Sequence, residues 1–111
     1  MIDKLQHVLS GSDLPFIVAV YLFGSLLHTL HPGDVDVLIV IGNNWRRNER
    51  ATRMSIAKCL VQVNSVTSLN AHLVVLTVSE VNELRLLSRI KSRVLWKATI
   101  ESKNSQQLTQ K

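Results

Sequence analysis

The chain has 111 residues, of which 46% are hydrophobic and 19% charged; this composition predicts one compact folded domain, with no room for a second catalytic or lid domain. Thirteen Lys and Arg residues against eight Asp and Glu give a formal net charge of +5 and a pI near 9.9, which favours an anionic partner such as a nucleotide, a nucleic acid or an acidic protein. The longest apolar runs have the length of a strand and are too short for the roughly 20 residues that cross a bilayer, so we expect no membrane partner.

The cysteine content indicates the cellular compartment. Cys59 is the only cysteine, so no disulfide can form within the chain. The N-terminal residues do not have the pattern of a signal peptide. We therefore expect a protein of the reducing cytoplasm, with Cys59 as a small core or boundary residue.

The first third of the chain predicts a helix, a buried strand and a second short helix. Apolar residues at helical spacing indicate an amphipathic helix over residues 1–9, with a stop at Gly11. The run from Phe16 to Phe23 is almost wholly apolar and rich in β-branched and aromatic residues, so we predict a buried strand. Ser25 is then a suitable N-cap for about two helical turns, which end at His31-Pro32-Gly33.

The middle of the chain predicts a second strand and a longer helix. The strand is expected over Asp34 to Ile41, and the helix from Trp45 to about Val63. Its first half carries four arginines, and its inward face is predicted to hold four apolar residues. The arginines are Arg46, Arg47, Arg50 and Arg53, and the inward residues are Met54, Ala57, Leu60 and Val61.

The last third predicts a third strand, over Leu69 to Val78, and a helix after it. Thr77 and Glu80 have the spacing of a capping box, so the helix should begin there. Residues 91–99 are expected to add a short strand or a helical end, and the polar tail 101–111 to be disordered. The residues expected on the buried side of the helix are Val81, Leu84, Leu87 and Ile90.

Together these elements predict the fold class and the domain. We expect an α/β (α+β) fold, in which a small mixed sheet of three to four strands has helices packed on it. Residues 1–100 are predicted to form this single domain.

Two aspartates stand at the head of the second predicted strand. Side chains two residues apart on a strand point to the same side, so Asp34 and Asp36 should project together. Carboxylates held this close repel each other, and burying them is costly unless they are paired or bind a cation. A hard divalent cation such as Mg²⁺ prefers oxygen ligands and would relieve the repulsion. The pattern therefore predicts a metal site.

A Gly-Ser pair precedes the predicted short helix and suits an anion. Gly24 allows a close approach that a side chain would prevent, and free N–H groups at the start of the helix attract negative charge. Ser25 adds a hydroxyl at the same place. Because the chain returns directly to the Asp34 strand, a phosphate cradle and metal-binding carboxylates should lie side by side. A metal-bound nucleoside triphosphate fits this arrangement.

These motifs resemble the DNA polymerase beta-like nucleotidyltransferase superfamily, and in particular its minimal nucleotidyltransferases. The resemblance rests on FGS at Phe23 to Ser25 and DVDV at Asp34 to Val37, and it extends from about Tyr21 to Glu83. It implies a nucleotidyltransferase-like fold and nucleotidyl transfer from a nucleoside triphosphate to an acceptor hydroxyl. It also implies Mg²⁺ or Mn²⁺ bound by Asp34 and Asp36, with the triphosphate held by Gly24 and Ser25.

The sequence departs from this family at the third carboxylate. Active members carry that group on the later strand, where we align His72. Imidazole is a poor ligand for Mg²⁺ but an acceptable one for Mn²⁺ or Zn²⁺, and a neutral histidine can accept a proton. We therefore predict Asp34, Asp36 and His72 as catalytic residues if the protein is an enzyme.

Two other functions are kept as alternatives. The first is a catalytically degenerate member that binds nucleotide or a helical partner protein without turnover, like the antitoxin half of a two-protein module. It gains support if no other carboxylate, such as Glu80, reaches the metal site. The second, ranked lowest, is nucleic-acid binding through the arginines of residues 46–53. These arginines also fit a solvated helix face, with Glu49 paired to Arg53.

Overall fold

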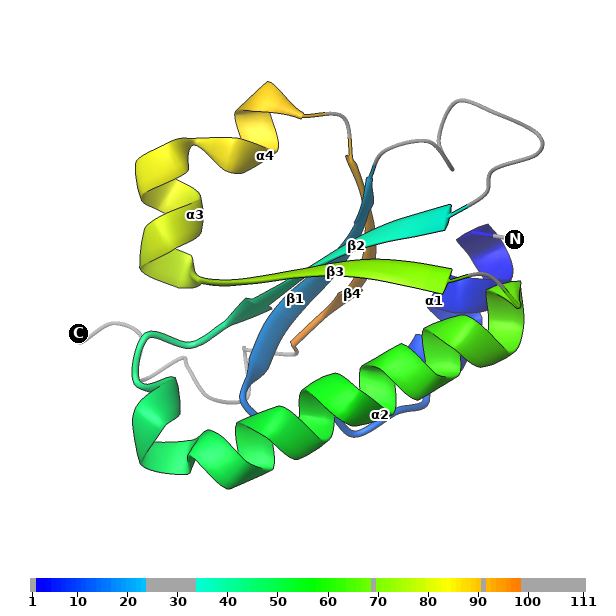
Figure 1. Cartoon of the computed structure of the whole chain (residues 1–111), viewed down its shortest axis with the longest axis horizontal. Helices are drawn as coiled ribbons and strands as arrows, with labels where there is room; N and C mark the ends of the chain where they lie inside the picture. The colour runs from blue at the N-terminus through cyan, green and yellow to red at the C-terminus, as the bar shows by residue number, and fades with distance from the viewer. Residues whose placement is uncertain (1, 24–33, 69, 91, 99–111) are drawn as a thin grey trace.

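The computed structural model describes residues 2–23, 34–68, 70–90 and 92–98, with the backbone alone at residues 34, 35 and 70. The helices are α1 (Ile2–Ser10), the 3₁₀ helix η2 (Trp45–Asn48), α2 (Glu49–Thr67), α3 (Val78–Leu84) and α4 (Leu86–Arg89). The strands are β1 (Ile17–Phe23), β2 (Asp34–Ile41), β3 (Asn70–Thr77) and β4 (Ser92–Lys97) (Figure 1). The predicted α/β fold class is confirmed.

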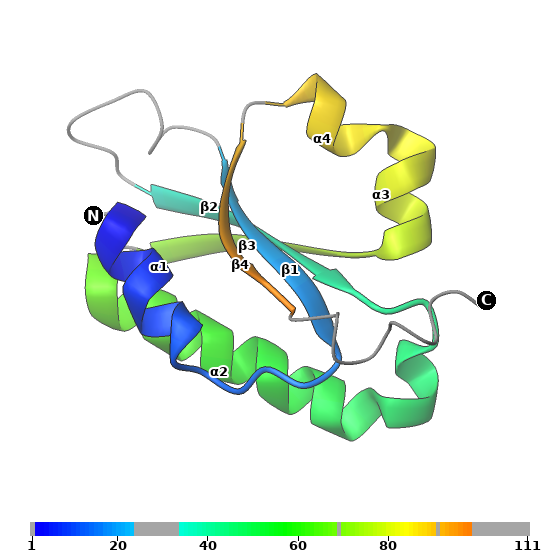
Figure 2. The ribbon, with the colours of Figure 1, turned by 180° about the vertical axis from the view of Figure 1, so that it is seen from behind.

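The strands form one mixed sheet in the order β3-β2-β1-β4. β1 is antiparallel to both β2 and β4, whereas β2 and β3 are parallel. A parallel pair needs a crossover connection, and α2 supplies it between β2 and β3. Helices α1 and α2 lie on one side of the sheet, and α3 and α4 lie on the other (Figures 1 and 2).

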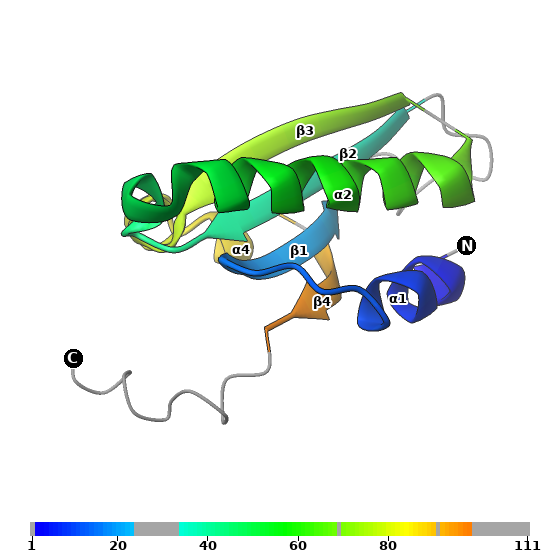
Figure 3. The ribbon, with the colours of Figure 1, turned by 90° about the horizontal axis from the view of Figure 1, so that it is seen from below.

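Each face of the sheet has its own apolar core. The larger core is buried under α1 and α2, which run along the same face of the sheet (Figure 3). The smaller core lies under α3 and α4. Fully buried members of the larger core include Leu5, Leu9, Val20, Leu22, Val37, Ile39, Cys59 and Val63, and the smaller core comprises Ala19, Leu38, Val40 and Val81.

A β-bulge in β1 sets which residues reach each core. Ile17 pairs with Ile41 and Ala19 pairs with Val40, so Val18 is an extra residue of β1 that has no paired residue on β2. As a result Ile17 and Val20 both belong to the core under α1 and α2, although they are three residues apart. Ala19 belongs to the opposite core.

The inward face of α2 differs from the predicted one. Met54 and Val61 are each 67% exposed, and Ala57 is exposed as well. Of the four predicted residues only Leu60 is partly buried, so the predicted face was wrong. The buried positions are Thr52, Ser55, Cys59, Val63 and Thr67.

Small polar side chains explain this difference. Thr52 and Thr67 bury their hydroxyls by donating to carbonyls one turn back, those of Asn48 at 2.8 Å and Val63 at 2.9 Å. Ser55 donates to the Pro15 carbonyl at 2.7 Å. Because each of these hydroxyls makes a hydrogen bond, the three polar residues can lie on the buried face of α2. A prediction based on apolar residues alone therefore misses that face.

The helix after β3 begins where the capping box predicted. Thr77 Oγ1 accepts a hydrogen bond from the Glu80 backbone N–H at 3.2 Å, and Glu80 Oε1 accepts one from the Thr77 N–H at 2.8 Å. The helix then ends early, at Arg85, whose φ is 50°. Leu84, the last residue of α3, is 47% exposed, so its predicted burial was wrong. Val81 is buried as predicted.

Two other expectations concern membranes and unplaced segments. No helix in the described part of the chain is long and apolar enough to cross a membrane. The predicted short helix after Ser25 and the tail 101–111 lie outside the described residues.

Candidate functional site

Four residues, one from each strand, form a row across one end of the sheet. Asp36 on β2 pairs with His72 on β3 and with Phe23 on β1, and Phe23 pairs in turn with Ser92 on β4. Directly paired residues project from the same face of a sheet. Leu38, two residues after Asp36, packs in the core under α3 and α4, so the row lies on that face.

Asp36 and His72 are in contact within this row. His72 Nδ1 lies 3.5 Å from Asp36 Oδ1, and the side chains are 65% and 22% exposed, respectively. The carboxylate is therefore partly withdrawn from water, while the imidazole remains open to it. An oxygen and a nitrogen donor held this way can share a proton or bind the same cation.

The other predicted site residues are placed only in part. Asp34 heads β2 and pairs with Asn70 through the backbone, and its side chain lies outside the described residues. Gly24 and Ser25, the predicted phosphate cradle, also lie outside them. The structure thus brings together Asp36 and His72, and the remaining three residues stay predictions.

Asp36 and His72 differ in their fit to a metal ion. The Asp36 carboxylate suits Mg²⁺, and the His72 imidazole suits Mn²⁺ or Zn²⁺ better. Within residues 2–23, 34–68, 70–90 and 92–98 no group of three or more His, Cys, Asp or Glu side chains is arranged to hold a metal ion. An octahedral ion on these two donors would take its remaining ligands from water or phosphate oxygens.

Glu80 does not supply a third carboxylate here. Thr77 is five residues beyond His72 on β3, a length of about 17 Å at the rise of a strand. Glu80 follows Thr77, and its carboxylate accepts hydrogen bonds from the Thr77 backbone and hydroxyl. It is therefore engaged at the opposite end of the sheet.

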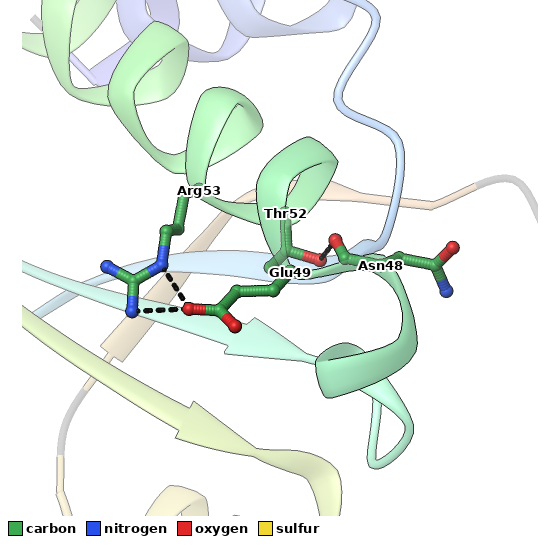
Figure 4. A network of polar contacts seen from close by, with 4 residues as sticks. All are labelled: Asn48, Glu49, Thr52 and Arg53. Atoms are coloured by element: carbon green, nitrogen blue, oxygen red, sulfur yellow. Dashed lines mark hydrogen bonds and ion pairs between the residues drawn. The ribbon is translucent and has the colours of Figure 1, made fainter.

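The arginines that precede and begin α2 are partly engaged. Arg53 forms an ion pair with Glu49, with 2.8 Å between Arg53 Nη2 and Glu49 Oε2 (Figure 4), as predicted. The Arg46 guanidinium lies over the Trp45 ring, 5.1 Å from its centre. Both arginines remain exposed, so they are accessible to a ligand.

Cys59 is buried in the larger core, as predicted. Burial raises the pKa of its thiol from 9.0 to about 11, because a thiolate would lose its hydration there. The thiol is therefore neutral at physiological pH and unsuited to nucleophilic chemistry.

Comparisons with models of protein families, with curated proteins and with solved structures found no match.

The sequence offered no signal for Ser92, which lies in a segment that predicts a strand or a helical end equally well. Its place in the row depends on β4 pairing with β1 across about 70 residues of chain, and such long-range pairing has no local sequence signature. Phe23, part of the FGS motif, reaches Asp36 through the pairing of β1 with β2.

Proposed function

We propose that this chain is a minimal nucleotidyltransferase-like protein that binds a metal–nucleoside triphosphate at the end of the sheet where Asp36 and His72 meet. The observation that carries the proposal is the contact between these two side chains, which come from adjacent strands at the positions where the resemblance requires metal-site residues. Asp34 would add a carboxylate, and Gly24 with Ser25 would hold the phosphates.

The residues of the pair have separate roles in this proposal. The Asp36 carboxylate binds the cation, and the His72 imidazole, when neutral, binds a softer cation such as Mn²⁺ or accepts a proton. A divalent ion bound there would neutralise charge on the triphosphate. Transfer of the nucleotidyl group to an acceptor hydroxyl is the activity that the resemblance implies.

A second function, binding without turnover, is favoured by a specific observation. The position of the third carboxylate holds His72, and Glu80 is engaged about 17 Å away in the capping box. A degenerate member of this kind would serve as a nucleotide-binding or antitoxin-like module with a helical partner protein. Nucleic-acid binding ranks below both, because Arg53 is paired with Glu49.

Titration calorimetry of ATP in Mg²⁺ and then in Mn²⁺ tests the proposal. The native protein should bind ATP only with a divalent ion, and more tightly with Mn²⁺. Asp36→Asn should abolish this binding, whereas Asp13→Asn, the same change at an exposed loop residue, should leave it intact. Absence of binding by the native protein in both metals, or equal binding by the two variants, would contradict the proposal.

Turnover distinguishes the two functions once binding is established. Incubation with radiolabelled ATP and candidate acceptors should give acceptor-linked nucleotide and pyrophosphate if the protein is an enzyme. Metal-dependent binding without pyrophosphate release with any of the hydroxyl acceptors offered would favour the binding module.

A further inference from the structure

A groove lies between α2 and the edge strand β3, at the end of the sheet opposite Asp36. Its volume is about 760 Å³, within the range of small-molecule sites. β3 is the outermost strand of the sheet, so the groove is open along this edge. The lining residues are Ile41, Trp45, Arg46, Thr52, Arg53, Ile56, Ala57, Leu60, Val75, Thr77 and Glu80.

The groove has a charged end and an apolar end. α2 begins near the end of the sheet where β3 ends (Figure 1), and Arg46, Arg53 and Glu80 line the groove there. Farther along α2 the walls are aliphatic, with Ile56 and Leu60 facing Val75. This distribution matches an elongated ligand with one polar head and an apolar body.

The charged groups at the polar end differ in how far they are already engaged. Arg53 forms an ion pair with Glu49. The Glu80 carboxylate accepts two hydrogen bonds from Thr77 at Oε1, which hold it in the capping box. Arg46 has no carboxylate partner among the described residues, and its guanidinium is held over the Trp45 ring. A guanidinium fixed in this way can bind a carboxylate through two parallel hydrogen bonds.

We propose that this groove binds a free amphipathic organic carboxylate, with its head on Arg46 and its apolar body against Ile56, Leu60 and Val75. The ligand class follows from the cationic anchor at one end and the aliphatic walls beyond it. Val75 pairs with Ile39 and packs on the face of the sheet under α1 and α2, whereas Asp36 lies on the opposite face, so this site is separate from the proposed nucleotide site.

Titration of monomeric decanoate into the ¹⁵N-labelled protein, followed by NMR, tests the proposal. Decanoate should shift the Trp45 indole N–H and the backbone amides of Ile56 and Val75 in a saturable way, and should leave the Trp96 indole on β4 unchanged. Decylammonium, which has the same chain and the opposite charge, should bind at least tenfold more weakly. No saturable shift, or equal affinity for the two amphiphiles, would overturn the proposal.

Two neighbouring arginines provide matched variants. Arg46→Gln should weaken decanoate binding about tenfold, because it removes the anchor. Arg47→Gln makes the same charge change next to it, at a residue that does not line the groove, and should change the affinity less than twofold. Equal losses would show that overall charge, and not this anchor, determines binding.

A last measurement separates a free ligand from a membrane lipid. The protein is sedimented with phosphatidylglycerol vesicles in the absence of decanoate. We expect it to remain in the supernatant at physiological salt. Sedimentation with the vesicles, together with no response to decanoate, would mean that this surface binds a lipid bilayer and would overturn the proposal.

Discussion

His72 Nδ1 lies 3.5 Å from Asp36 Oδ1 across the parallel pair of β2 and β3. A carboxylate in place of the imidazole would stand at the same position in the sheet. Two carboxylates at this distance would repel each other, and a divalent cation would relieve that repulsion. The identity of residue 72 should therefore set which metal the site prefers.

Replacing His72 with Asp should shift the metal preference from Mn²⁺ toward Mg²⁺. We expect about tenfold tighter ATP binding in Mg²⁺ than for the native protein, since Mg²⁺ gains an oxygen ligand. The measurement is titration calorimetry in each metal. His72→Asn, which has a similar size and no charge, is the control; an equal gain in both variants would show that the carboxylate is not responsible.

The burial pattern of α2 predicts opposite outcomes for two valines on this helix. Val63 is fully buried and Val61 is 67% exposed. Val63→Ala should lower the free energy of unfolding by about 2 kcal/mol through lost burial and a cavity. Val61→Ala should change it by less than about 0.5 kcal/mol. Urea unfolding measures both changes. A larger loss of stability at Val61 would contradict this burial pattern and support the inward face predicted from the sequence.

Ser55 joins α2 to the segment before β1. Its hydroxyl donates to the Pro15 carbonyl at 2.7 Å, and the residue is 3% exposed. Ser55→Ala should lower the free energy of unfolding by about 1 kcal/mol, because the lost hydrogen bond outweighs the better helix propensity of Ala. Ser65→Ala, at an exposed position of the same helix, should be neutral or slightly stabilising. Equal effects in urea unfolding would contradict this role of the hydroxyl.

The buried thiol of Cys59 should make stability fall at high pH. Its pKa is raised from 9.0 to about 11 in the folded protein, so above pH 9 the unfolded chain loses the proton while the folded chain keeps it. The contribution of this thiol to the free energy of unfolding is therefore fully present below pH 9. Between pH 9 and 11 the free energy of unfolding falls by about 2–3 kcal/mol.

Urea unfolding between pH 8 and 11 measures this effect. Cys59→Ala is the comparison, because it retains every other titrating group. The variant should be less stable than the native protein near pH 8, by about 1 kcal/mol for the lost packing, and the two curves should cross as the pH rises, because only the native protein loses the larger thiol contribution. Parallel curves would show that Cys59 does not contribute to the pH dependence.

The fold was more predictable than the details of its packing. β2 has the predicted bounds, because its apolar run is bracketed by Gly33 and Gly42. The capping box located the start of α3, since both of its hydrogen bonds are local. The inward face of α2 was not predictable from apolar spacing, because two of its buried residues, Thr52 and Ser55, are polar and satisfy their hydroxyls by hydrogen bonds to backbone carbonyls.

The candidate site depends on the pairing of two strands. The resemblance aligned His72 with a third carboxylate, and its contact with Asp36 follows from the register of the parallel pair β2 and β3. The Arg46 anchor of the groove was not apparent, since the four arginines look equivalent in the sequence. Only the stacking of Arg46 on Trp45 and the course of α2 along β3 distinguish it.

The bulge at Val18 makes this the one point of β1 that tolerates the loss of a residue. Ile17 pairs with Ile41 and Ala19 with Val40, so deleting Val18 would leave both pairs in register. Ile17, which is 2% exposed, would stay on the face toward α1 and α2. A deletion farther along the strand would instead turn every residue before it onto the opposite face. Related chains that keep this packing should therefore differ in strand length at the bulge and not beyond it.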